Sequence, residues 1–251
     1  MESRKEPMSS LSKPERAIHE LVIANRILAH EGVLDAFGHI SIRDRERPDR
    51  YWMARSRSPE LVEAGDIMEF DLDSNPVDQH GRVMYGERPI HGCIYAARPE
   101  VMAVCHNHAH SLVPFGVTGA VIKPIWHMAA GIGSEIPIWD IREQFGDTNL
   151  LVTSNDQGRS LARSLGQRRV CLMRGHGGVV AAHDLRATVF IAIYLMVNAA
   201  LLKDARAMGE VKVLSDGEIK LANELLLTPL AQDRAWEYWC RRAGFSTGAE
   251  N

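Results

Sequence analysis

The chain has 251 residues, a hydrophobic fraction of 45% and a charged fraction of 24%, which is an ordinary composition for a globular protein. Its net charge of −3 and isoelectric point near 6.4 argue against a nucleic-acid partner or an anionic membrane surface. We expect no stretch apolar enough to cross a bilayer. The polar start, Met1 to Ser10, lacks the core of a signal peptide, and four scattered cysteines indicate reduced thiols in a cytoplasmic protein.

The length suits one large α/β domain over 1–251, with a polar N-terminal tail, 1–12, and a C-terminal helical extension, 210–251. Ser12-Lys13-Pro14-Glu15 has the pattern of a capping box, so a helix starts there, and Gly32 ends it. The predicted strands are 39–43, 51–54, 67–72, 101–106, 150–153 and 170–173. The remaining predicted helices are 89–97, 110–117, 156–165 and 184–208. Because strands adjoin near 39–72 without helices between them, we expect a mixed sheet with helices on both faces.

Two histidines at the end of a predicted buried strand are the strongest chemical signal. In a strand, residues two apart point to the same face, with Cβ atoms roughly 7 Å apart. His106 and His108 can therefore converge on one ion, while Asn107 points to the opposite face. A single histidine is more often structural than a ligand, so the paired spacing matters.

A catalytic metal site needs a third ligand and open positions. His176 is the best candidate because it follows a predicted strand and is flanked by Gly175, Gly177 and Gly178. Glycines there let the backbone approach an ion and leave room for a substrate. His110 is the alternative third ligand, although it lies beyond the strand end.

These motifs resemble the class II aldolase/adducin family from about Glu15 to Gly209. The matching segments are Glu87, His91, Ile94-Tyr95, Arg98-Pro99, His106-x-His108 and Gly175-His176-Gly177. The resemblance implies a three-layer α/β/α fold with a central mixed, largely antiparallel sheet. It also implies that His106, His108 and His176 bind one divalent ion (Zn²⁺, Mn²⁺ or Fe²⁺), that Glu87 is the acid/base residue, and that the chain forms a homotetramer.

The phosphate-binding residues of the family's sugar-phosphate aldolases are missing here. Gly38 is followed by His39 instead of Asn, and the segment directly before Glu87, Met84-Tyr85-Gly86, contains no serine. In their place Arg55 and Arg57, with Ser56 between them, present two forked cations suited to carboxylates. The alternative for these arginines is a solvated surface loop.

Several segments resemble the decarboxylase branch of the family, including the ones around Arg55–Ser58, Glu87–Gly92 and Met173–Gly177. That branch contains 2-hydroxy-3-carboxymuconate-semialdehyde, dihydroxyphthalate and 3-hydroxy-2-methylpyridine-4,5-dicarboxylate decarboxylases. The resemblance implies a carboxy-lyase that removes CO₂ from a hydroxylated aromatic or ring-opened carboxylate. The ion would stabilise the enolate left by CO₂.

The remaining candidates have weaker support. His39 is a second candidate for proton transfer and equally a structural residue, and His127 is a pocket candidate. Tyr238 is most simply a packing residue, but related enzymes lend a C-terminal residue to a neighbouring subunit's site.

Two other functions stay open from the sequence. The first is a sugar-phosphate aldolase or epimerase, which the missing phosphate-binding residues oppose. The second is a non-catalytic, adducin-like assembly module, which would not need the four residues His106, His108, His176 and Glu87.

Overall fold

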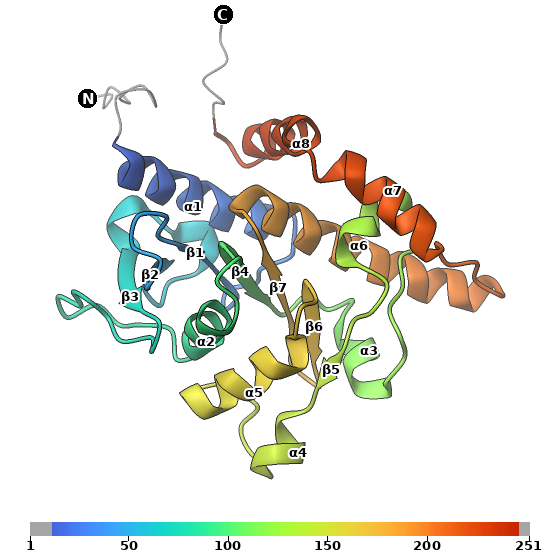
Figure 1. The fold of residues 1–251 in the computed structure, drawn as a ribbon, viewed down its shortest axis with the longest axis horizontal. Helices are drawn as coiled ribbons and strands as arrows, with labels where there is room; N and C mark the ends of the chain where they lie inside the picture. The colour runs from blue at the N-terminus through green and yellow to red at the C-terminus, as the bar shows by residue number, and fades with distance from the viewer. Residues whose placement is uncertain (1–11, 246–251) are drawn as a thin grey trace, which may run out of the picture.

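The computed structural model describes residues 12–245 of the chain. Residues 1–11 of the expected polar tail and 246–251 of the expected C-terminal extension lie outside the described residues. The core of the fold is a seven-stranded sheet with the order β3-β2-β1-β4-β7-β6-β5 (Figure 1). Every neighbouring pair is antiparallel except β5 and β6, so the expected mixed, largely antiparallel sheet is confirmed.

The elements within 12–245 are short strands and helices of varied length, with three 3-10 turns between them. The strands are β1 His39–Arg43, β2 Arg50–Ala54, β3 Ile67–Asp71, β4 Ala103–Asn107, β5 Ile138–Trp139, β6 Val170–Met173 and β7 Gly177–Ala182. The helices are α1 Lys13–His30, α2 Pro89–Ala97, α3 Val113–Thr118, α4 Ile141–Phe145, α5 Asn155–Leu165, α6 Leu185–Met208, α7 Asp216–Leu226 and α8 Pro229–Arg242. The 3-10 turns are η2 Pro59–Leu61, η3 Ala64–Asp66 and η4 His127–Ile132.

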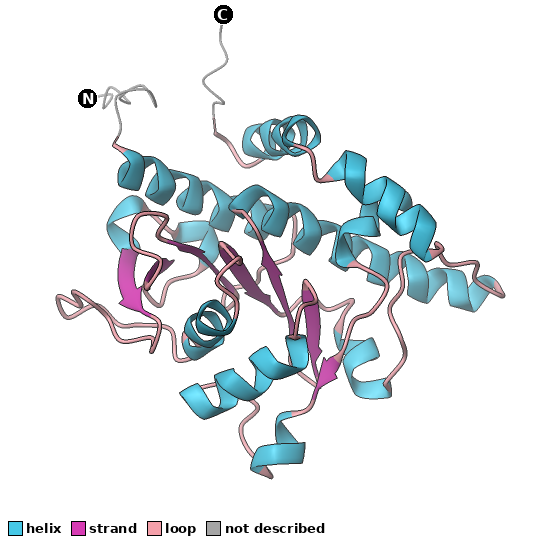
Figure 2. Cartoon of the chain, viewed as in Figure 1, coloured by secondary structure: helices cyan, strands magenta, loops and turns pink. Residues whose placement is uncertain are grey.

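Helices cover both faces of the sheet, which gives the expected three layers. Helices α1 and α6 pack on one face and α2 and α5 on the other, and α8 lies outside α1 and α6 (Figure 2). Residues of one strand point alternately to the two helix layers. On β1, Ile40 and Ile42 alternate with His39 and Ser41, and the latter two meet α2 through hydrogen bonds to His91.

The longest helix, α6, corrects one sequence expectation. By length and composition it is a helix that can cross a bilayer, although we expected no such stretch. Its side chains explain the apolar composition, because 67% of its most apolar window is buried inside the molecule. Helix α6 packs against β4, β7 and α1, and so it supplies a large part of the core.

Helix starts were well marked in the sequence. The capping box is present at α1, where the Glu15 amide donates to Ser12 Oγ and the Ser12 amide donates to Glu15 Oε2 at 2.8 Å. The expected stop at Gly32 also fits, since Gly32 has a φ of +76° directly after the helix. Asp184 caps α6 by accepting from the Ala187 amide at 2.7 Å.

The predicted strand at 150–153 is wrong. Leu150 has a φ of +68°, which no strand residue adopts. The amides that a strand would pair are taken by side chains: Val152 donates to Glu87 Oε1 at 2.9 Å, and Thr153 donates to Gln157 Oε1 at 2.9 Å. The segment is therefore a loop that is held in place by side-chain acceptors. The sequence analysis also missed β5, α4 and β7.

Helices α2 and α5 pack unusually closely, and Gly158 makes this possible. A Cβ added at Gly158 would lie 2.6 Å from the carbonyl oxygen of Pro89 and 2.8 Å from Cys93 Sγ. Both neighbours belong to α2, whose first residue follows Glu87 by two positions. The position of Glu87 thus depends on a helix contact that tolerates no side chain.

We predict that Gly158→Ala destabilises the protein by about 1–3 kcal/mol, because the added methyl group overpacks the α2–α5 contact. Urea unfolding of the full chain measures the change. The control is Gly217→Ala on α7, where the nearest atom to an added Cβ is 3.8 Å away. That variant should be unchanged or up to about 1 kcal/mol more stable. Equal stability of Gly158→Ala and the wild-type chain would contradict the close-contact interpretation.

Candidate metal centre and its cavity

Three histidine nitrogens and one carboxylate oxygen meet at the ends of β4, β6 and α2. His106 is in β4, His108 follows that strand directly, His176 is in the β6–β7 connection, and Glu87 precedes α2. The Nε2 atom of His108 lies 3.1 Å from Nε2 of both His106 and His176. Glu87 Oε2 lies 3.5 Å from Nε2 of His106 and of His176. The structure therefore brings together the four residues that the sequence singled out.

The spacing of these donor atoms suits a small divalent ion. With metal–ligand distances near 2.0–2.2 Å, neighbouring ligands of a tetrahedral site lie about 3.3–3.6 Å apart. The four atoms of the cluster all lie within 4.8 Å of one another, and the closest separations are 3.1 and 3.5 Å. This donor set, three imidazoles and one carboxylate, can hold a metal ion.

Two of the histidines form hydrogen bonds through Nδ1, and these bonds turn the Nε2 lone pairs toward the cluster. His106 Nδ1 donates to the carbonyl oxygen of Gly178 at 3.2 Å, and His108 Nδ1 donates to the Asp35 carboxylate at 3.1 and 3.2 Å. A neutral imidazole whose proton is on Nδ1 has a lone pair on Nε2, which is the form that binds metals. His176 Nδ1 is buried and has no hydrogen-bond partner among residues 12–245.

Local backbone geometry places His176. The β6–β7 hairpin pairs Met173 with Gly177, which leaves a connection of Arg174, Gly175 and His176. Gly175 has a φ of +67°, a conformation that glycine adopts without strain. A Cβ at Gly177 would overlap the Asn107 carbonyl oxygen, so this glycine serves the contact between β7 and β4. The glycine at 177 is therefore required by strand packing and not, as the sequence suggests, by an approach of the backbone to an ion.

Glu87 is a buried carboxylate with one fixed oxygen. Its Oε1 accepts the Val152 amide at 2.9 Å, and Oε2 faces the histidines. Burial alone raises the pKa of Glu87, but hydrogen bonds and charge from His106 and His176 outweigh burial and hold the pKa well below its ordinary value. The group is thus a carboxylate at neutral pH, able to accept a proton or to bind a cation.

A cavity of about 670 Å³ opens beside the cluster. Its wall includes His108, His176, Glu87, His39, Arg57 and Tyr85. Ser56 and Ser58 also line it, as does the loop at Asn149–Leu151. A small organic molecule with polar groups fits a cavity of this size and composition.

The two arginines expected to face a substrate have different positions. Arg57 lines the cavity, whereas Arg55 is not among the residues of its wall. Both guanidinium groups contact Asp66, with Arg55 Nε at 2.6 Å from Oδ1 and Arg57 Nε at 3.3 Å from Oδ2. Burial acts to raise the pKa of Asp66, but the Glu63 amide and Arg55 outweigh burial and lower it. Arg55 therefore anchors Asp66, and Asp66 positions Arg57.

His39 lies in a buried polar group behind the cavity. Its register in the sheet pairs it with His106, and the two ring centroids are 5.1 Å apart. His39 Nδ1 is 2.7 Å from His91 Nε2. Burial, with the charge of His106 second, lowers the pKa of His91 to about 3, so His91 is neutral at pH 7. The ring of Tyr85 packs on His39 at 4.5 Å between centroids.

Three other candidates lie outside this cavity within the single chain. His127 is exposed on η4 beside Trp126, and Tyr238 is 58% exposed on α8, where it lines a different, apolar groove. Neither contributes to the wall of this cavity in the single chain. His110 is exposed and is absent from the donor cluster.

The sequence analysis missed Asp35, Tyr85 and the loop around Leu150. Asp35 accepts the amides of Phe37 and Gly38 at 2.9 Å as well as the proton of His108. Its only sequence signal is that it lies a few residues before the His39 strand. Tyr85 donates its hydroxyl hydrogen to the Arg57 carbonyl oxygen, which ties two walls of the cavity together.

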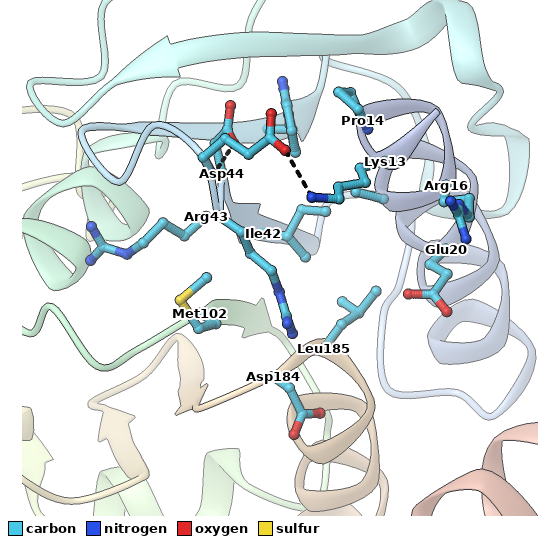
Figure 3. Close-up of a pocket in the computed structure, with 14 residues that line it drawn as sticks. Lys13, Pro14, Arg16, Glu20, Ile42, Arg43, Asp44, Met102, Asp184 and Leu185 are labelled. Atoms are coloured by element: carbon cyan, nitrogen blue, oxygen red, sulfur yellow. Dashed lines mark hydrogen bonds and ion pairs between the residues drawn. The ribbon is translucent and has the colours of Figure 1, made fainter. Parts of the chain in front are cut away.

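A second cavity, of about 590 Å³, lies between the start of α1, the end of β1 and the start of α6 (Figure 3). Several of its charged groups have partners within the protein. Lys13 contacts Glu46 at 3.4 Å, the Arg43 guanidinium donates to carbonyl oxygens of Tyr95 and Arg98, and Asp184 caps α6. This cavity offers no comparable cluster of reactive groups.

Comparison with known proteins gives a family and a set of relatives. The family described as Class II Aldolase and Adducin N-terminal domain matches residues 19–202. Decarboxylase tropJ of Talaromyces stipitatus is 34% identical over 239 residues, which cover 86% of this chain and 89% of the relative. The 3,4-dihydroxyphthalate decarboxylase of Arthrobacter keyseri is 31% identical over 218 residues, covering 79% of this chain and 83% of the relative.

Solved structures agree on the fold. An L-fuculose 1-phosphate aldolase from Glaciozyma antarctica PI12 superposes with a TM-score of 0.74 at 18% identity, covering 98% of this chain and 97% of that one. The relatives named decarboxylases support a lyase, and among lyases a decarboxylase.

We predict that Asp35→Asn lowers the affinity for Zn²⁺ by about 10- to 100-fold, because His108 Nδ1 loses its anionic partner. Competition with a chelator measures the affinity of the full chain. The matched control is Asp78→Asn, which removes the carboxylate of an exposed Asp–His pair, Asp78 with His80. Identical zinc affinities of Asp35→Asn and Asp78→Asn would contradict the role of Asp35.

Proposed function

The chain belongs to the class II aldolase and adducin family, and we propose that it is a metal-dependent decarboxylase of a hydroxylated aromatic or ring-opened carboxylate. The observation that supports this most is the convergence of three Nε2 atoms beside a cavity that also contains Arg57. We propose further that the chain acts as one such domain, with 210–251 as its helical extension, in a cytoplasmic homotetramer.

In this proposal His106, His108 and His176 hold one divalent ion, which is Zn²⁺, Mn²⁺ or Fe²⁺. When bound, the ion supplies Lewis-acid stabilisation of negative charge on a substrate oxygen. The Nδ1 hydrogen bonds of His106 and His108 keep both rings in the ligating tautomer. The donor set and its spacing support this assignment.

Arg57 is the proposed partner of the substrate carboxylate. Its Nε lies 3.3 Å from Asp66 Oδ2, an ion-pair contact without a hydrogen bond, and its terminal nitrogens form no hydrogen bond with residues in 12–245. A guanidinium group held in this way can bind a carboxylate through two parallel hydrogen bonds. Ser56 and Ser58 add hydroxyl groups on the same wall. The missing phosphate-binding residues and this fixed cation together favour a carboxylate over a sugar phosphate.

Glu87 is the proposed acid/base residue. As a carboxylate it accepts the hydroxyl proton of the substrate on binding. Glu87 then gives this proton to the carbon that carries the carboxylate, which turns the enolate oxygen into a carbonyl oxygen. When the carbon–carboxylate bond breaks, its electron pair moves toward that carbonyl oxygen and CO₂ leaves. The product oxygen takes one proton from solvent on release, which balances the reaction. His39 is the second candidate for contact with the reacting substrate.

Two activities separate the proposal from its alternative. We expect the zinc- or manganese-loaded protein to release CO₂ from a dihydroxylated aromatic dicarboxylate and to leave a ketose 1-phosphate intact. The variant His108→Ala should lose both bound metal and CO₂ release, because too few ligands remain. Cleavage of the ketose phosphate without CO₂ release would favour the aldolase, and a chain that binds no metal would favour the assembly module.

A second variant tests the role of Glu87. We predict that Glu87→Gln retains the metal, since three imidazoles remain, but loses about 10²- to 10⁴-fold in turnover. Metal content by atomic emission and the rate of CO₂ release are measured on the same sample. Loss of the ion from Glu87→Gln would instead make Glu87 a required fourth ligand.

A further inference from the structure

Four buried polar side chains form one hydrogen-bonded chain behind the cavity. The Tyr95 hydroxyl is 2.8 Å from Ser41 Oγ, Ser41 Oγ is 2.6 Å from His91 Nδ1, and His91 Nε2 is 2.7 Å from His39 Nδ1. His39 is 1% exposed and the other three are fully buried. The spacing explains the alignment: His39 and Ser41 share one face of β1, while His91 and Tyr95 are one turn apart on α2.

The Tyr95 end of this series of hydrogen-bonded side chains determines the direction of all its hydrogen bonds. Within residues 12–245, Ser41 Oγ is the only acceptor for the Tyr95 hydroxyl hydrogen, because the neighbouring Val104 amide can only donate. A fully buried hydroxyl hydrogen without an acceptor is costly, so Tyr95 donates to Ser41. If the chain ran in the opposite direction, Ser41 would donate to Tyr95 and the Tyr95 hydrogen would have no acceptor.

Each later bond follows from the first. Ser41 has one hydrogen, which it donates to His91 Nδ1, so the single proton of neutral His91 is on Nε2. His91 then donates to His39 Nδ1, which must be an unprotonated acceptor. The one proton of His39 is therefore on Nε2. No residue in 12–245 forms a hydrogen bond with that nitrogen, and the His39 ring lines the cavity.

We propose that Tyr95, Ser41 and His91 are positioning residues that hold His39 as its Nε2–H tautomer, so that His39 donates a hydrogen bond to an oxygen of the substrate. A neutral imidazole keeps its proton at neutral pH, and its N–H stabilises negative charge that develops on oxygen. His39 would then act beside the ion, and the proton transfer stays with Glu87. The substrate part of this proposal rests on the proposed function, whereas the tautomer does not.

The tautomer can be measured without activity. In zinc-loaded full-length protein labelled with ¹⁵N-histidine, two-bond ¹H–¹⁵N correlations distinguish protonated from unprotonated ring nitrogens. The His39 signals are identified by their loss in His39→Gln. We expect an unprotonated Nδ1 and a protonated Nε2 in His39. A protonated Nδ1 would overturn the proposal, whatever the reaction of the enzyme proves to be.

Two isosteric variants test the series of hydrogen-bonded side chains. Tyr95→Phe removes the terminal donor, so His39 should populate both tautomers. CO₂ release should then fall about 3- to 10-fold in kcat with little change in KM or bound zinc, the size expected for one hydrogen bond. Tyr51→Phe is the matched control, because Tyr51 is also fully buried but donates to Ser74 Oγ at 3.0 Å instead of to Ser41. It should stay within twofold of wild type and keep a single His39 tautomer.

The outcomes separate the two proposals. Equal effects of Tyr95→Phe and Tyr51→Phe on the His39 signals would show general packing and overturn the positioning role. Ser41→Ala breaks the same chain at its centre and should reproduce Tyr95→Phe, which guards against a folding defect in one variant. If wild-type protein releases no CO₂, the proposed function fails, but the ¹⁵N measurement still decides the positioning role.

Discussion

The rest of the structure depends on one constraint, which is that three imidazole Nε2 atoms are held close together. Nε2 of His108 lies 3.1 Å from Nε2 of His106 and of His176, and hydrogen bonds to Gly178 and Asp35 prevent two of the rings from turning away. The protein therefore keeps three donor nitrogens in an arrangement that a bound cation stabilises. The Gly178 carbonyl and the Asp35 carboxylate that hold these rings are therefore part of the site, as the ligands are.

The antiparallel sheet is what brings these groups together from distant parts of the chain. Strand β4 lies between β1 and β7, so its end is adjacent to His39 on one side and to the β6–β7 connection on the other. Helix α2 adds Glu87 at its start and His91 along its length. The close contact at Gly158 keeps α2 in place. Packing far from the ligands thus sets the direction of the buried carboxylate.

Sequence patterns predicted the parts of this arrangement that depend on local chemistry. The capping residues marked the start of α1 and α6, and the HxH spacing gave a pair of ligands at a strand end. The three-layer fold and the family followed from the resemblance and are confirmed. The strand β7 was missed because its glycine- and alanine-rich sequence, Gly177–Ala182, has no alternation of polar and apolar residues.

Relations between segments distant in sequence could not be predicted. Nothing near His108 points to Asp35, because that contact depends on how the 31–38 loop lies across the end of β4. Arg55 and Arg57 look equivalent in the sequence, and only the position of Asp66 separates the anchoring arginine from the one at the cavity. The 150–153 segment looked like a strand because its apolar residues were read without the side chains that accept its amides.

The 150–153 loop bears on how proteins with this fold come to act on different substrates. Because 150–153 is a loop whose amides donate to side-chain acceptors and pair with no strand, its sequence can change without shifting the register of the sheet. The ligands, in contrast, lie at strand ends whose pairing leaves no such freedom. New substrates can therefore be accommodated by replacing this wall of the cavity, while the reactive centre is inherited unaltered.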